Sequence, residues 1–80
     1  MYTCENHRPI TGAENMSDAA EIIAGRKARS IFGRRGYART LRLDCWSQDG
    51  SVGEFESFIG YRTAQNETTG CNVRFTITKR

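Results

Sequence analysis

The fold is set by the segment MSDAAEIIAGRKARSIFGRR, residues 16–35, which precedes three runs of alternating apolar and polar residues. At about 100° per residue, the apolar side chains of this segment gather on one broad face. The members of that face are Met16, Ala20, Ile23, Ala24, Ala28 and Ile31, with Phe32 at its margin. Lys27 projects into the same face, where its stem could run along the edge of a core. We therefore predict a single amphipathic helix over residues 16–35.

Both ends of this helix carry the expected signals. Asn15 or Ser17 can cap the N-terminus, because each offers a side-chain oxygen to the free backbone N–H groups. Gly36 is expected to end the helix, since glycine enters the left-handed conformation after a helix without strain. Three small residues on the apolar face should allow the helix to approach a sheet closely.

Three runs after the helix alternate with the period of a β-strand. They span residues 37–46, 54–61 and 71–78, and the polar segment 62–70 is expected to be a long loop between the last two. Around Asp49 and Gly50 we expect a hairpin with an odd number of loop residues and Gly50 in a left-handed bulge. Burial favours that register because it places apolar residues opposite apolar or small ones. The predicted pairs are Leu41 with Ile59, Leu43 with Ser57, and Cys45 with Phe55.

The predicted fold class is therefore α+β, with one helix packed on a three-stranded antiparallel β-meander. The 80 residues form a single domain, with the helix at 16–35 and the sheet within 37–78. Residues 1–15 are irregular in pattern, although Tyr2, Cys4 and Ile10 could add a short edge strand.

Composition narrows the class of protein. No apolar run approaches the roughly 20 residues that span a bilayer, and the N-terminus lacks the apolar core of a signal peptide. The three cysteines cannot all pair within one chain, which is typical of an intracellular protein with reduced thiols. We therefore expect a cytoplasmic protein without a membrane segment.

Charge is distributed unevenly along the chain. Residues 22–43 contain seven basic residues and no acid, whereas the remainder contains five basic residues and nine acids. A basic region of this kind attracts polyanions or acidic protein surfaces. The alternative is a solvated face that only aids solubility, but such faces usually mix both signs. The predicted partner-binding residues are Arg26, Arg29, Arg34, Arg35, Tyr37, Arg39 and Arg42, which we expect to form one surface.

Two large aromatic residues, Trp46 and Phe58, are predicted to lie on the sheet face opposite the helix. They could form a contact surface for a partner or for a second copy of the chain, because aromatic residues anchor interfaces. They could instead stack on nucleic-acid bases. A further alternative is that the N-terminal segment folds over this face and covers them.

The sequence contains only weak indications of a catalytic or metal-binding site. Cys4 and His7, with Cys45 and Cys71, could in principle hold zinc, but only one pair has close spacing and both distal cysteines suit strand positions. Glu54 and Glu56 share a strand face, which is explained more simply by an acidic patch that balances basic neighbours. We expect no enzyme activity, no metal and no cofactor.

The layout resembles the small type I anti-CRISPR inhibitors of phages and mobile elements. The similarity covers residues 15–61, in which the stretch Ser17–Ala24 is followed by basic residues and a strand hairpin. It implies a non-enzymatic inhibitor that acts in the cytoplasm of a bacterial host. Such a protein binds the subunits of a CRISPR effector complex and blocks target DNA binding or nuclease recruitment.

Many of these inhibitors are acidic mimics of DNA, and the basic region here departs from that pattern. It suggests contact with an acidic protein surface, with guide RNA or with DNA. The alternative function is a small basic nucleic-acid-binding module.

Overall fold

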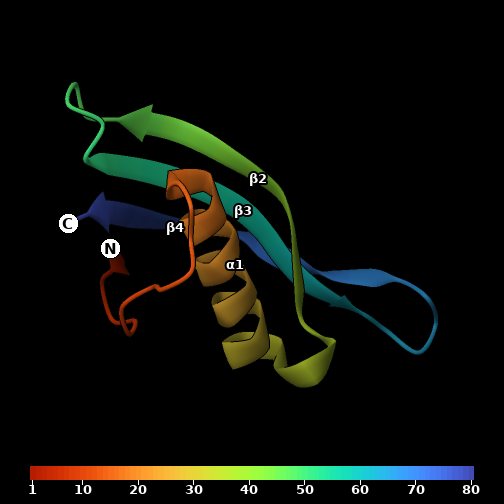
Figure 1. Cartoon of the computed structure of the whole chain (residues 1–80). Helices are drawn as coiled ribbons and strands as arrows, with labels where there is room; N and C mark the ends of the chain where they lie inside the picture. Colours follow the sequence, from red (N-terminus) through yellow and green to blue (C-terminus); the bar gives the residue numbers. More distant parts are fainter.

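The computed structural model describes residues 1–80 and contains one helix packed on a four-stranded antiparallel sheet. Its strand order is β1-β4-β3-β2, so the last three strands form the predicted meander and the short N-terminal strand adds an edge (Figure 1). The α+β prediction is confirmed. The elements are β1 (Tyr2–Cys4), α1 (Met16–Phe32), the 3₁₀ turn η1 (Gly33–Arg35), β2 (Tyr37–Trp46), β3 (Val52–Arg62) and β4 (Thr68–Lys79).

Asn15 caps the helix, as one of the two predicted alternatives: its side-chain oxygen accepts a hydrogen bond of 2.9 Å from the backbone N–H of Asp18. The predicted end of the helix was wrong. Gly33, with φ of 74°, is the residue after α1, and the N–H of Gly33 donates to the carbonyl of Arg29. A glycine with positive φ therefore occurs three residues before the glycine we expected, and the chain continues from it as a 3₁₀ turn.

Gly36 is required for space. Its φ of −65° suits any residue, but a Cβ atom here would lie 2.3 Å from the carbonyl oxygen of Ala28. Glycine thus allows the chain to pass against the helix on its way into β2. This close approach fixes where β2 begins relative to the end of α1.

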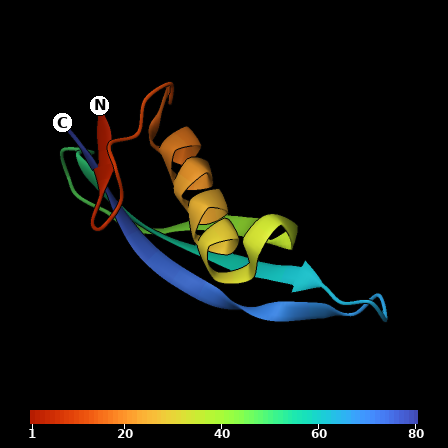
Figure 2. The same ribbon diagram turned by 90° about the horizontal axis from the view of Figure 1, so that it is seen from below.

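The core lies between the helix and one face of the sheet, and the other face is not covered by the helix (Figure 2). The helix contributes mainly small side chains, so its backbone lies close to the strands. Phe55 and Phe75 stack across β3 and β4 with ring centroids 6.0 Å apart. The fully enclosed cluster consists of Cys4, Ile10, Ala19, Ala20, Ile23, Ala24, Phe55, Phe75 and Ile77. Lys27 is half-buried near Cys4 and Phe75 at the edge of this core, as its amphipathic side chain allows.

The N-terminal segment packs on the helix side of the sheet. Tyr2 forms a bridge with Ile10, and Ile10 and Cys4 are buried in the core. Arg26 of the helix donates a hydrogen bond of 3.0 Å from Nη1 to the carbonyl of Arg8. The segment therefore does not cover the opposite face of the sheet, which stays open.

The predicted register of β2 against β3 was wrong. Near the turn, Trp46 pairs with Gly53 around an even loop, although Gly50 does take a positive φ of 74°. Two irregularities then shift the ladder, one between Arg39 and Arg42 and one between Leu43 and Cys45. Each inserts one extra residue into β2, so its faces cannot be derived from strict alternation.

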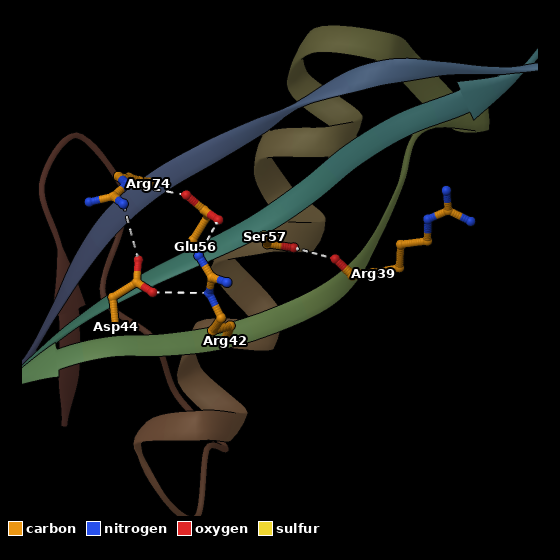
Figure 3. Close-up of polar contacts among 6 residues, drawn as sticks. All are labelled: Arg39, Arg42, Asp44, Glu56, Ser57 and Arg74. Carbon is orange, nitrogen blue, oxygen red and sulfur yellow. Dashed lines mark hydrogen bonds and ion pairs between the residues drawn. The ribbon is translucent and has the colours of Figure 1, made fainter.

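Thr40 lies at the first of these bulges with φ of 58°. A β-branched residue in this left-handed region is strained, and such bulges commonly re-aim neighbouring side chains. A side-chain hydrogen bond connects the two strands beside this bulge. Fully buried Ser57 donates a hydrogen bond of 3.0 Å from Oγ to the carbonyl of Arg39, on the strand opposite (Figure 3).

The β3–β4 ladder is regular and longer than predicted. It pairs Val52 with Thr78 at one end and Arg62 with Thr68 at the other, so only residues 63–67 remain as a loop. Part of the expected long loop is therefore strand. This hairpin extends beyond the helix, and its tip lies at the end of the molecule opposite to the termini (Figure 1).

Candidate binding surface

Three arginines from separate elements meet at one hollow beside the tip of the β3–β4 hairpin. Arg35 comes from η1, Arg39 from the start of β2, and Arg62 from the end of β3. Tyr37 and Thr63 complete the lining, and the volume is about 570 Å³. We call this feature the basic hollow. No carboxylate side chain is among its lining residues.

Arg39 is held by aromatic rings. Its guanidinium carbon lies 4.9 Å from the centroid of the Phe58 ring and 5.9 Å from that of Tyr37. These distances are in the range of cation–π attraction. Register explains the first contact, because Arg39 is directly opposite Phe58 in the β2–β3 ladder and shares its face.

Phe58 itself lies against two glycines. A Cβ atom on Gly60 would be 2.9 Å from the Phe58 ring, and one on Gly70 would be 2.8 Å from it. Gly60 and Gly70 are paired across β3 and β4. The ring therefore lies over bare backbone on the open face of the sheet and also contacts the guanidinium of Arg39.

Neutral groups also orient the other side of the hollow. Arg62 donates a hydrogen bond of 3.1 Å from Nη1 to the side-chain oxygen of Asn66. Tyr37 and Thr68 form a hydroxyl contact of 3.5 Å. Ring faces, an amide and hydroxyls thus position these side chains without cancelling the positive charge of the arginines.

Arg42 has a different environment from Arg39, although only three residues separate them. Its Nε lies 3.0 Å from Asp44 and its Nη2 lies 2.8 Å from Glu56. Arg74 of β4 completes the cluster, at 3.5 Å from Asp44 and 3.2 Å from Glu56. Figure 3 shows this closed group on the sheet, with the guanidinium of Arg39 well apart from it.

These four contacts are the only ion pairs of the chain. The expected single basic surface is therefore divided. Arg35, Tyr37 and Arg39 meet at the hollow, and exposed Arg34 neighbours them on η1. Arg42 is compensated by carboxylates. Arg26 binds the N-terminal segment, and the guanidinium of Arg29 folds back toward Gly25.

Sequence reasoning did not include Arg62 in the site. The sequence pattern predicts a loop at this position, whereas Arg62 ends β3 and pairs with Thr68. The pairing of the two strands would have indicated its position. Because Tyr37 is opposite Gly60, Arg62 lies two residues further along β3, beside the start of β2.

The two predicted interface aromatics do not form one surface. Phe58 pairs with Arg39, whereas Trp46 pairs with Gly53 near the other end of the strand. Five residues along β3 separate these positions, or roughly 17 Å at the rise of a strand. Trp46 is 68 % exposed, and Phe58 is half-buried.

The potential zinc ligands are also dispersed. Cys4 is buried, Cys45 and Cys71 are exposed, and no group of three or more His, Cys, Asp or Glu side chains could hold a metal ion. Burial raises the pKa of the Cys4 thiol above its ordinary value. Burial, with the nearby Lys27 and Arg26, lowers the pKa of His7.

Comparison of the chain with protein-family models, with curated proteins and with solved structures finds no match in any of the three. None of the helices has the length and apolar character needed to cross a membrane.

Proposed function

We propose that this chain is a non-enzymatic binding protein whose basic hollow engages an anionic partner. The observation that carries the proposal is the convergence of Arg35, Arg39 and Arg62 on one hollow without a carboxylate. Like charges in proximity repel one another, and an anionic partner would relieve that repulsion. The contrast with Arg42, whose donors are bonded to Asp44 and Glu56, supports a role for the hollow beyond general solubility.

More specifically, we propose an inhibitor of the anti-CRISPR kind, encoded by a phage or mobile element and active in the cytoplasm of its bacterial host. It would bind a CRISPR effector complex and block target DNA binding or nuclease recruitment. Support comes from the resemblance of residues 15–61 in layout and from the size of the chain. The hollow lies at one end of a body measuring 46 × 22 × 20 Å, so the site could enter a recess of a large complex.

Co-purification with type I effector complexes and phage plating on strains that carry them test this function. The double variant Arg35→Glu with Arg39→Glu should lose both binding and protection, because it reverses the charge of the hollow. Arg8→Glu with Arg80→Glu is the matched control, since it makes the same change of charge in the N-terminal segment bridged to β1 and at the C-terminus, which lies opposite the hairpin tip (Figure 1). Circular dichroism should show that both variants are folded.

The control should bind and protect like the unchanged protein. The specific proposal fails if the unchanged protein neither co-elutes with effector complexes nor protects phage across several subtypes. The general proposal of an anion-binding hollow fails if the two double variants lose binding equally, because net charge alone would then explain the effect.

A further inference from the structure

We propose that the basic hollow seats a phosphodiester group of a nucleic-acid backbone, and that it does so without reading the bases. This inference rests on the proposed function, because it names the ligand chemistry of the same site. Two features favour a phosphate over the carboxylates of an acidic protein: the number of free donors and the charge to be balanced. The packing of the Phe58 ring bears on whether the bases are read.

The donors of the hollow are free. A ring face orients a guanidinium without occupying its N–H groups, so Arg39 keeps all five donors. Arg62 uses only one amino group, for Asn66. By comparison, Arg42 uses Nε and Nη2 on carboxylates. Arg39 can therefore present the planar fork that binds two oxygens of a phosphate.

Neutral donors complete the site. The Oγ of Thr63 accepts a hydrogen bond of 3.2 Å from the backbone N–H of Glu67, which leaves the hydroxyl hydrogen of Thr63 available. The hydroxyl of Tyr37 has only a long contact of 3.5 Å with Thr68. Hydroxyls and arginines together are the groups that proteins place around backbone phosphates.

Charge also favours a polyanion. The hollow carries three positive charges and its lining contains no acid, so one carboxylate would leave most of that charge uncompensated. A nucleic-acid strand offers successive phosphates, which can meet the three arginines in turn. Arg34, exposed on η1 beside Arg35, lies where the strand could continue.

The Phe58 ring next to the hollow is already packed against other groups of the chain. One side of Phe58 lies over the backbone of Gly60 and Gly70, and its ring also holds the guanidinium of Arg39. Phe58 therefore acts as a positioning residue for Arg39. Because the Phe58 ring is already packed against glycine backbone and a guanidinium, and the hollow is dominated by arginines, binding should show little preference for base sequence and strong dependence on salt.

The test is fluorescence anisotropy of labelled DNA of mixed sequence, duplex and single-stranded, over a series of KCl concentrations. Three phosphate contacts predict a log–log slope of about −2.7 on duplex and about −2.1 on single strands. Arg39→Gln should make the duplex slope shallower by about 0.9. Arg42→Gln is the matched control and should leave the slope unchanged, because the donors of Arg42 are already bonded to acids.

Phe58→Leu separates positioning from charge. It keeps an apolar side chain over the glycines and removes the ring face, so affinity should fall about two- to fivefold with the salt slope unchanged. Urea unfolding of each variant verifies that the fold is retained. Permuting the DNA sequence should change the affinity of the unchanged protein very little.

Absence of DNA binding at low salt overturns the inference. So does a loss of slope in Arg42→Gln equal to that in Arg39→Gln, since a diffuse surface rather than the hollow would then be responsible. If the protein inhibits an effector complex but binds no DNA, the proposed function stands and the phosphate site fails. If it binds DNA as described but inhibits no effector complex, the phosphate site stands and the inhibitor function fails.

Discussion

The hydroxyl of Ser57 should be a measurable contributor to stability, because it spans the bulge that places Arg39. Ser57 is fully buried in a row of core-facing residues on β3, where an apolar side chain would be the ordinary choice. Its Oγ donates at 3.0 Å to the carbonyl of Arg39. The bond lies beside the bulge between Arg39 and Arg42, where the β2–β3 ladder is irregular. Ser57→Ala removes this bond, together with the longer contact of 3.3 Å from the same hydroxyl to the carbonyl of Phe58.

The expected loss follows from the geometry. One internal hydrogen bond contributes about 0.5–1.5 kcal/mol net. A carbonyl that is left without a partner in a partly buried position adds to that cost, so we expect a total of about 1–2 kcal/mol. For a domain of this size, each kcal/mol corresponds to a fall in Tm of about 4–8 °C. The slope of urea unfolding should not change, since the surface exposed on unfolding is nearly the same.

Ser30→Ala provides the matched control. Ser30 is exposed on the helix, and its replacement should change stability by no more than about 0.5 kcal/mol. Thermal and urea unfolding of both variants should therefore separate clearly. Equal stability of Ser57→Ala and the unchanged protein would refute the role of the hydroxyl in holding the bulge.

Three further predictions concern the glycines, the turn and the cysteines. Gly36→Ala should lower Tm, because the new Cβ would lie 2.3 Å from the backbone of the helix. Gly25→Ala should raise Tm, because alanine has a higher helix propensity than glycine. A change of Tm in the same direction for both variants would contradict the close packing at Gly36. Hydrogen bonds from Ser47 and Ser51 lower the pKa of Asp49 from 3.8 to about 2. The Asp49 carboxylate should therefore stabilise the turn fully above pH 3.8, and this stabilisation should be lost as the pH falls through about 2. A carbon NMR titration that gives Asp49 a pKa of 3.8 would contradict this prediction. Alkylation of the native protein should modify the two exposed cysteines, whereas buried Cys4 should react only after unfolding. Equal alkylation rates for all three cysteines would show that Cys4 is not enclosed.

Much of the fold follows from local patterns. The 3.6-residue periodicity from Met16 and the capping residue Asn15 placed the start of the helix correctly, and β2 spans 37–46 as its alternation predicts. The end of the helix was misplaced because two glycines, Gly33 and Gly36, both suit a helix terminus. Which of them turns left-handed depends on the path of the chain into the sheet, and Gly36 is needed where that path crosses Ala28.

The site was only partly predictable. The density of arginines is evident in the sequence, and Arg35 and Arg39 of the predicted set line the hollow. Which arginines remain without an ion pair could not be deduced, because Asp44 and Glu56 reach Arg42 only through the register of β2, β3 and β4. Inserting one residue into β2 changes which side chains are opposite one another, and alternation alone does not reveal such a bulge.

The amino-acid order thus determined the element types and the excess of positive charge, since periodicity and composition act over a few neighbouring residues. Tertiary structure decided which charges are cancelled and which converge. Arg62 joins Arg35 and Arg39 only because the β3–β4 hairpin extends past the helix and brings distant residues together. Electrostatic effects depend on distances in space, and those distances are fixed by strand register and packing rather than by separation along the chain.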